Sequence, residues 1–250
     1  MIDDLKREII QKKIRSKPTE PKEIKCKKCN DKGVLFTEDS KGYRFARDCI
    51  CRRVKRWNTK NKNNGMSLRL KANTFNSFMA NNPNLIDAKN KAMNYARNWR
   101  GNSLLICGSV GSGKTHLGLA VVNAIAESEI NGNSFYQVLP EIVFYTNLIG
   151  KLKSSMSFSS QLDTDKIMNK FKNERLLMID DFLKLEKSNI AITWLFEIIN
   201  YRYINGLPTI ITTEYTPKEL INIDEALGSR LVEMAGKENT IIINSKNMRI

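Results

Sequence analysis

Residues 104–127 have the sequence LLICGSVGSGKTHLGLAVVNAIAE. It opens with an apolar run typical of a buried strand and closes with a pattern typical of an amphipathic helix. Between the two, residues 108–115 match G-x-x-x-x-G-K-[ST] in full, the signature of a loop that holds nucleotide phosphates. A chance glycine-rich turn is the alternative, and the flanking strand and helix disfavour it. The sequence therefore predicts a nucleotide site here.

Each residue type in this loop has a chemical reason. The glycines let the backbone curl so that successive N–H groups face phosphate oxygens, and the following helix adds its positive end. We expect Lys114 to reach the β- and γ-phosphates and Thr115 to offer its hydroxyl to Mg²⁺. His116 is the only histidine, and we expect it to be a packed or capping residue. The residues predicted to bind the nucleotide are Gly108, Ser109, Val110, Gly111, Ser112, Gly113, Lys114, Thr115, His116 and Asp180.

The second half of a nucleotide site requires a strand that ends in a carboxylate. The stretch RLLMIDDF at 175–182 has four apolar residues followed by Asp180 and Asp181. We expect Asp180 to hold Mg²⁺ through water beside Thr115, and Asp181 to orient or deprotonate the attacking water. A helix-capping carboxylate is the alternative role for Asp181.

Two more positions complete the predicted site. The stretch PTIITTEYT at 208–216 reads as a strand, and its end at Thr213 and Glu214 would lie beside the γ-phosphate if it neighbours the phosphate-loop strand. Arg230 lies near the start of a predicted helix, where it could complete the site of a neighbouring subunit. An ion pair with Glu233 is the alternative for Arg230.

From about residue 71 onward, short β-branched segments alternate with longer helical patterns, including helices at 116–127 and 190–203. A small polar loop is expected at 154–161. The predicted strands cover residues 104–107, 143–146, 176–179, 209–213 and 240–243. This alternation predicts an α/β fold with a mainly parallel sheet covered by helices on both faces.

Four of the five cysteines form two close pairs, Cys26 with Cys29 and Cys49 with Cys51. Because no signal peptide precedes them, a tetrahedral zinc site on a small hairpin is favoured over disulfides. Reduced, unligated thiols are the alternative. A module this small buries little core, so Zn²⁺ would supply much of its folding free energy. The fifth cysteine, Cys107, ends a predicted strand and is expected in the core.

The positive charge is concentrated in the front third of the chain. Residues 1–71 hold 22 Lys+Arg and 9 Asp+Glu, whereas residues 72–250 hold 19 and 17. This asymmetry predicts an acidic partner, either nucleic acid or an acidic protein face, with an ordinary solvated surface as the alternative. Cations also cluster around Trp57, which suits either single-stranded nucleic acid or a flexible basic linker. These cations are Arg52, Arg53, Lys55, Arg56, Lys60 and Lys62.

These patterns predict three segments: a helix at 3–16 with the zinc module within 1–55, a basic linker at 56–72, and an ATPase domain at 73–250. No apolar run is long enough to span a membrane, and the stretch MIDDLKREII lacks the apolar block of a signal peptide. We therefore expect a cytoplasmic protein.

With these residues assembled, the chain resembles the DnaC/DnaI-type replicative helicase loaders of bacteria and phages. They are a branch of the AAA+ ATPases that includes the IstB-like transposition helpers. The resemblance runs from about Asn73 to the carboxyl terminus. It rests on TFNSF, GSVGSGKTHL, the doubled Asp of LLMIDDF, ITTEYT, GSRL and the terminal NMR, together with the front Cys-x-x-Cys…Cys-x-Cys segment.

The resemblance implies an ATP-controlled switch that delivers a hexameric replicative helicase onto single-stranded DNA. The front module would bind the helicase, and the ATPase core, a slow ATPase stimulated by DNA or its partner, would assemble with copies of itself. It also implies an arginine finger at Arg230 and a closing basic residue at Arg249. One position departs from the family pattern, because Glu214 stands where the family often has Asn; Thr213 is expected to substitute as the γ-phosphate sensor.

Three alternatives stay open. The first is a transposition helper that uses the same core to act on a transposase and duplex DNA. The second is a small-molecule phosphoryl-transfer enzyme, which the lack of arginine between residues 147 and 174 disfavours. The third is a non-enzymatic zinc-dependent DNA-binding protein, which would leave the phosphate loop unexplained.

Overall fold

The computed structural model describes residues 25–38, 41–63, 66–132, 138–158, 161–185 and 187–244. The chain divides into two compact units, Met1–Arg53 and Val54–Ile250, which we describe separately. The predicted helix at 3–16 and Arg249 lie outside the described residues. No helix in the described part of the chain has both the length and the hydrophobicity to cross a bilayer.

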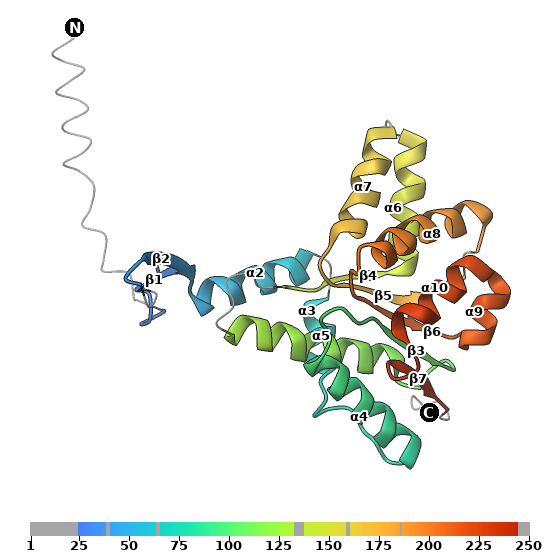
Figure 1. Ribbon diagram of the computed structural model, residues 1–250, viewed down its shortest axis with the longest axis horizontal. Coiled ribbons are helices and arrows are strands. Elements are labelled where there is room, and N and C mark those ends of the chain that lie inside the picture. Colours follow the sequence, from blue (N-terminus) through green and yellow to red (C-terminus); the bar gives the residue numbers. More distant parts are fainter. Residues whose placement is uncertain are drawn as a thin grey trace, which may run out of the picture. The chain divides into compact units, whose positions relative to one another are not determined.

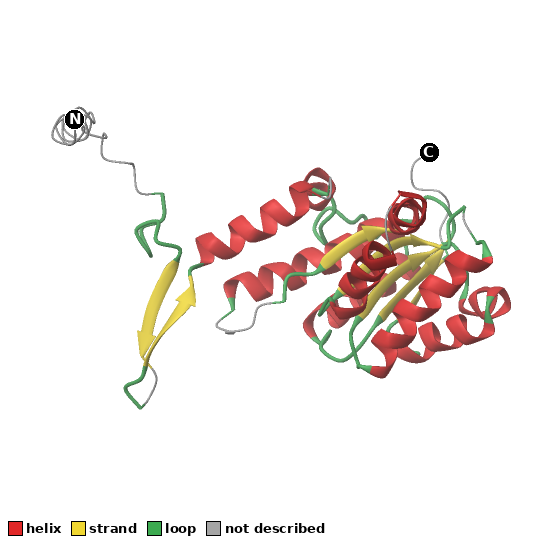
Figure 2. Ribbon diagram, turned by 90° about the horizontal axis from the view of Figure 1, so that it is seen from above, coloured by secondary structure: helices red, strands yellow, loops and turns green. Residues whose placement is uncertain are grey.

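The first unit contains an antiparallel hairpin of β1 (Val34–Glu38) and β2 (Arg44–Asp48) (Figure 2). The strands pair from Val34 opposite Asp48 to Glu38 opposite Arg44. Gly33 enters β1 with a φ of 75°, a left-handed conformation that favours glycine. The prediction of a hairpin between the two cysteine pairs is confirmed.

The second unit is built on a five-stranded sheet in the order β4-β5-β6-β3-β7 (Figure 1). All neighbouring strands are parallel, so the predicted fold class is confirmed. The strands are β3 (Leu104–Gly108), β4 (Glu141–Phe144), β5 (Leu177–Phe182), β6 (Thr209–Thr213) and β7 (Thr240–Ile243). The side chains of β3, β4, β5 and β6 are almost continuously buried, as expected for parallel strands covered on both faces.

Helices cover both faces of this sheet, and the alternation along each strand divides the core in two (Figure 2). On β3, Leu105 and Cys107 pack into the cluster with α6, α7, α8 and α10, whereas Leu104 and Ile106 pack into the cluster with α3, α4 and α5. The helices are α3 (Ser67–Ala72), α4 (Pro83–Arg97), α5 (Lys114–Asn131), α6 (Tyr145–Phe158), α7 (Gln161–Asn173), α8 (Asn189–Ile204), α9 (Pro217–Ile223) and α10 (Glu225–Ala235). Cys107 is therefore a core residue, as predicted.

The structure differs from the sequence prediction at two strand and loop boundaries. The predicted strand at 143–146 is shifted, because β4 ends at Phe144 and α6 begins at Tyr145. The predicted polar loop at 154–161 is wrong over 154–158, which continue α6. The Ser155 hydroxyl has hydrogen-bond partners within the helices, since Ser155 Oγ donates to the Leu152 carbonyl of α6 and lies 2.7 Å from Thr164 Oγ1 of α7.

The stretch predicted as a flexible basic linker is largely helical. Helix α2 runs over Ile50–Asn63, and α3 follows at Ser67. Trp57 packs against the core cluster that holds Leu70, and Lys60 Nζ lies 2.9 Å from the buried carboxylate of Glu141. The burial of the Trp57 ring and the ion pair between Lys60 and Glu141 thus stabilise a helix in residues whose composition alone indicates a loop.

Arg202, near the end of α8, is fully buried and ties α7, α8 and β6 together. Burial lowers the pKa of its guanidinium to about 10. It donates to the carbonyls of Phe171, Lys172, Glu174 and Pro208 and to the Thr209 hydroxyl, over distances of 2.6 to 3.1 Å. These acceptors cluster where two helices end and a strand begins.

We expect Arg202→Met to lower the free energy of unfolding by about 3 kcal/mol, because several buried acceptors lose their donor at once. Chemical denaturation followed by circular dichroism measures this. The control Arg97→Met removes an exposed arginine from α4 and should change stability by less than about 0.5 kcal/mol. Equal losses in both variants would contradict the proposed role of Arg202.

Candidate nucleotide site and metal centre

The phosphate loop connects β3 to α5 and has the backbone shape that its sequence predicts. Gly113 caps α5 with a φ of 94°, a left-handed conformation that favours glycine. At Gly108 an added Cβ would lie 2.6 Å from the Ile243 carbonyl oxygen, so no other residue fits between β3 and β7. The loop therefore leads directly into the start of an 18-residue helix, a position suited to binding an anion.

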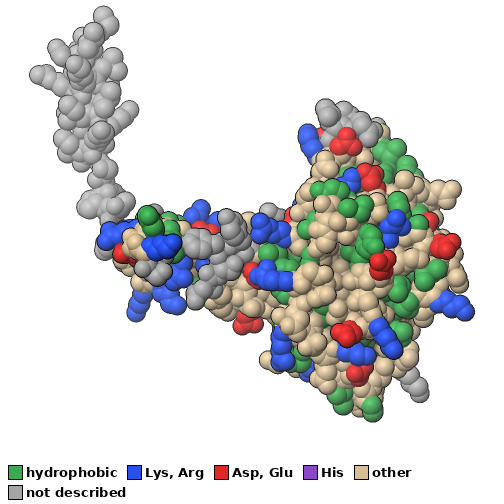
Figure 3. Space-filling view, viewed as in Figure 1, with side chains coloured by type: hydrophobic (Ala, Val, Ile, Leu, Met, Phe, Trp, Pro, Cys, Tyr) green, Lys and Arg blue, Asp and Glu red, His purple; other side chains and the backbone are tan. Residues whose placement is uncertain are grey.

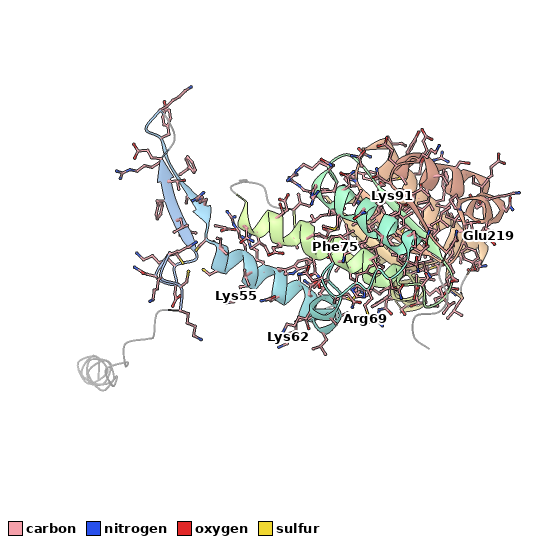
Figure 4. The ribbon with its side chains drawn as sticks, turned by 90° about the horizontal axis from the view of Figure 1, so that it is seen from below. Lys55, Lys62, Arg69, Phe75, Lys91 and Glu219 are labelled. Carbon is pink, nitrogen blue, oxygen red and sulfur yellow. The ribbon has the colours of Figure 1, made fainter. Side chains whose placement is uncertain are left out.

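A cavity of about 430 Å³ opens over this loop. Its lining comes from α3, the phosphate loop and the ends of β5 and β6, and Arg69 of α3 is labelled in Figure 4. The lining residues are Arg69, Asn73, Val110, Gly111, Gly113, Lys114, Thr115, His116, Asp181, Lys184 and Glu214. The sheet order brings these residues together, because β3, β5 and β6 are neighbours that end at the same edge.

Lys114 is almost fully buried at the base of the cavity. Its Nζ donates to the Ser109 carbonyl at 2.7 Å. Burial lowers the pKa of Lys114, and among its charged neighbours Glu214 opposes this most, followed by Asp181. An ammonium group that lacks water and faces the loop is suited to bind phosphate oxygens.

Thr115 and Asp180 meet as the sequence predicts, and Thr212 joins them. Asp180 Oδ1 accepts from Thr115 Oγ1 at 3.0 Å and from Thr212 Oγ1 at 2.5 Å. The other oxygen, Oδ2, is buried and has no partner. Burial raises the pKa of Asp180 and the Asp181 charge adds to this, whereas the Thr212 and Thr115 hydrogen bonds oppose it. A buried carboxylate oxygen without a partner beside the loop threonine fits the water shell of a Mg²⁺ ion.

Asp181 lies on a β-bulge at the end of β5. The register with β6 shifts between Ile179 and Phe182, and Asp181 has a φ of 56°. Its amide donates to Thr212 Oγ1 at 3.0 Å, and its Oδ2 accepts from Lys184 Nζ at 3.1 Å. The next helix, α8, has Ser188 as its N-cap, so the helix-capping alternative for Asp181 is wrong. The carboxylate faces the cavity instead.

The four front cysteines converge in the first unit. Their sulfur atoms all lie within 4.8 Å of one another, with Cys26 and Cys49 3.8 Å apart and Cys29 and Cys51 3.4 Å apart. Those distances exceed a disulfide bond and approach the spacing of about 3.8 Å expected for sulfurs on a tetrahedral zinc with bonds of about 2.3 Å. The cluster could therefore hold a metal, as predicted.

Backbone contacts preorganise this cluster. The Gly33 amide donates to Cys29 Sγ at 3.3 Å, and the Asp31 carboxylate accepts from the amides of Lys25 and Cys26. Hydrogen bonds, chiefly from the Cys29 amide, lower the pKa of Cys26 to about 7, whereas the contact with Cys29 raises that of Cys51 to about 12. Metal binding requires these thiols to lose their protons, and a cation among them would offset the repulsion between the resulting thiolates.

Residues 70–235 match the family described as the bacterial DnaA ATPase domain. The chain belongs to this family.

Relatives of this DnaA-family chain include the uncharacterized protein YqaM of Bacillus subtilis. It is 28% identical over 220 residues, which cover 82% of this chain and 66% of YqaM. The phage-like element PBSX protein XkdC of Bacillus subtilis is 31% identical over 149 residues, 57% of this chain and 51% of XkdC. The matched region thus spans between half and about two thirds of these relatives.

Solved structures agree with the family assignment. The DnaC helicase loader aligns with a TM-score of 0.58 at 26% identity, covering 70% of this chain and 99% of that chain. DnaI aligns at 0.57 and 22% identity over 73% of this chain and 93% of that one. AMPPCP-bound DnaA from Aquifex aeolicus aligns at 0.55 and 22% identity over 70% and 51%. The chain therefore has the AAA+ fold of nucleotide-binding replication proteins, as its motifs predict.

Thr213, expected near the γ-phosphate in this DnaA-family site, points elsewhere. Its Oγ1 donates to the Phe182 carbonyl at 3.0 Å and accepts from the Tyr215 amide at 3.3 Å. Because side chains alternate along a strand, the preceding Thr212 faces Asp180 instead. The expectation that Thr213 lies beside the γ-phosphate is therefore not met, whereas Glu214 does line the cavity.

Arg230 lies in the middle of α10 and is not among the described residues that line the cavity of its own chain. Its Nε donates to Asn200 Oδ1 at 2.8 Å, and its guanidinium lies 4.7 Å from the centre of the Phe196 ring. Glu233, the alternative ion-pair partner, accepts from the Tyr203 hydroxyl at 2.7 Å. Arg230 is thus half-buried on the surface of α10, away from the residues that line the cavity of its own chain.

His116 is a packed residue, as expected. Its Nε2 lies 3.0 Å from the Thr74 carbonyl oxygen and 3.1 Å from Ser77 Oγ, and its ring contacts the edge of Phe78. Burial lowers the pKa of His116. The ring therefore anchors residues 74–78 to the phosphate-loop helix.

Sequence reasoning missed four residues of this site, namely Arg69, Asn73, Lys184 and Thr212. Arg69 lies within residues 56–72, which the sequence predicts to be a linker. In the structure its guanidinium lies 4.9 Å from the centre of the Phe144 ring. Lys184 follows Asp181 by three residues, and this spacing is the sequence feature that could have indicated its contact with Asp181.

The basic cluster around Trp57 is divided in its roles. Trp57 is partly buried against the core and Lys60 pairs with Glu141, so neither is a free nucleic-acid contact. Lys55 and Lys62 are exposed on α2 (Figure 4). In the first unit, Lys and Arg side chains gather over the hairpin (Figure 3).

Proposed function

We propose that this chain is an ATP-hydrolysing loader that binds a hexameric replicative DNA helicase and delivers it onto single-stranded DNA. The observation that carries the proposal is the pairing of Thr115 with Asp180 beneath the phosphate loop, with one Asp180 oxygen left without a partner. The alignment with nearly the whole of the DnaC helicase loader chain supports the choice of partner.

In this proposal the loop amides and Lys114 bind the β- and γ-phosphates of ATP, and Thr115 and Asp180 hold Mg²⁺. The ion would neutralise charge on the phosphate oxygens. Asp181, with its carboxylate at the cavity wall, orients the attacking water and accepts its proton. Arg230 of one copy would reach the nucleotide site of the next copy and stabilise the negative charge of the transition state for phosphoryl transfer.

We assign residues 1–55 to partner binding, 56–72 to the connection and 73–250 to the ATPase domain. The cysteine cluster would hold Zn²⁺ through Cys26, Cys29, Cys49 and Cys51, which supports the assignment because their sulfurs converge. The basic surface of this module suits an acidic face of the helicase or the DNA that the helicase encircles.

Affinity purification of the full chain from its native cell, followed by mass spectrometry, tests the partner. We expect a replicative helicase to co-purify, and we expect slow ATP hydrolysis by the purified chain to rise with single-stranded DNA more than with duplex DNA. Recovery of a transposase together with stimulation by duplex DNA would favour the transposition helper. A purified chain that binds neither ATP nor a helicase would overturn the proposal.

A further inference from the structure

A cation with two carboxylate partners lies at the wall of the nucleotide cavity, and the roles assigned above do not use it. Lys184 Nζ lies 3.1 Å from Asp181 Oδ2 and 3.3 Å from Glu214 Oε1. All three side chains are about one third exposed, at 37%, 29% and 31%, and all three line the cavity. The group is therefore accessible to a bound nucleotide.

The backbone holds Lys184 in a strained loop. Three residues from Asp181 to Leu185 adopt left-handed conformations, namely Asp181 at 56°, Leu183 at 61° and Leu185 at 69°. Bulky residues rarely adopt this conformation, and such strain persists mainly at sites where function requires it. Two hydrogen bonds hold the first part of this loop, because Thr213 Oγ1 donates to the Phe182 carbonyl and the Lys184 amide donates to the Asp181 carbonyl. The position of Lys184 is thus defined by the fold.

Glu214 creates an electrostatic problem for a nucleotide. It follows β6, which pairs with the strand that enters the phosphate loop, and it lines the same cavity as Lys114. A carboxylate beside a triphosphate repels it, and the repulsion is strong where water is scarce. A cation beside Glu214 would reduce this repulsion, and the Lys184 ammonium lies 3.3 Å from the Glu214 carboxylate.

We infer that Lys184 is the γ-phosphate-sensing residue of this chain: Glu214 and Asp181 hold its ammonium without ATP, and the ammonium turns to the γ-phosphate when ATP binds. ADP lacks that phosphate and leaves the ion pairs intact. In the ATP state Asp181 is released from Lys184 and is free to orient water, and the loop that leads to α8 responds to the γ-phosphate. This inference rests on the proposed function, because it requires the cavity to bind ATP.

Isothermal titration calorimetry with Mg²⁺·AMPPCP and Mg²⁺·ADP tests the inference on the full chain. We expect Lys184→Ala to weaken AMPPCP binding by about 10-fold or more, the size expected for the loss of a charged hydrogen bond, and to change ADP binding by less than about 3-fold. Adding Glu214→Gln to Lys184→Ala removes the repulsion of the unpaired carboxylate, but AMPPCP should still bind less tightly relative to ADP than in the parent chain, because the hydrogen bond from the ammonium to the γ-phosphate is still missing.

The matched control is Lys187→Ala, in the same loop. Lys187 lies against the Tyr215 ring, 4.3 Å from its centre, and is not among the described cavity residues, so we expect less than about 2-fold change with either nucleotide. Thermal unfolding shows whether each variant is folded. Equal weakening of ADP and AMPPCP binding by Lys184→Ala, or a double variant that regains the parent chain's ratio of the two affinities, would overturn the inference but not the proposed function. A parent chain that binds neither nucleotide would overturn the proposed function with it.

Discussion

Chelation of zinc is expected to unfold residues 25–53 while residues 54–250 stay folded. The described part of the first unit buries almost no apolar side chain apart from Cys29 and Cys49, and a lone two-stranded hairpin is marginally stable in water. A structural Zn²⁺ contributes about 10–16 kcal/mol of apparent binding free energy in small metal-dependent modules. Loss of the ion would therefore remove most of what stabilises the hairpin.

Native mass spectrometry measures the zinc stoichiometry, and hydrogen exchange measures the protection of β1 and β2. We expect one zinc per chain, and we expect that protection to disappear with a chelator and in Cys49→Ser. Cys107→Ala is the control, because Cys107 lies in the sheet of the second unit and its loss should leave the zinc content unchanged. Persistent protection of the hairpin after complete zinc removal would contradict the metal site.

Lys114→Ala is expected to weaken ATP binding by about 100-fold, because it removes the buried ammonium that we propose binds the β- and γ-phosphates. Asp180→Asn should keep much of the nucleotide affinity and lower turnover by about 100-fold or more. The Asn oxygen can still accept from Thr115 and Thr212, but an amide NH₂ would replace the carboxylate oxygen that now lacks a partner. That group cannot bind the water shell of a cation.

Calorimetry gives the affinities, and phosphate release gives the turnover. Lys218→Ala, at an exposed position of α9, is the matched control for Lys114→Ala and should change both by less than about 2-fold. Turnover by Asp180→Asn equal to that of the parent chain would contradict the role of Asp180 in holding Mg²⁺.

The site residues that the sequence predicts have local sequence signals, whereas those that it does not predict reach the site through contacts between distant segments. The phosphate loop, Asp180 and Asp181 follow apolar strand segments directly, and the four cysteines form two short-range pairs. Each of those signals is complete within about ten residues. Arg69 carries no local signal and Lys184 has only its spacing from Asp181, since both line the cavity through the folding of α3 and of the loop after β5. Thr212 was missed because neighbouring threonines on one strand look alike until the facing of the strand is known.

Glycine spacing, apolar runs and paired thiols are local patterns. They were therefore sufficient to predict the α/β class, the phosphate loop between a strand and a helix, the carboxylates at the end of β5 and the set of four cysteines. Only the tertiary structure decided the strand order, the helical state of residues 50–63, and the choice of Thr212 over Thr213 beside Asp180. It also decided the contact of Lys184 with Glu214, 30 residues further along the chain. These features depend on pairing and packing between segments far apart in the chain, whose energies no short stretch of sequence contains.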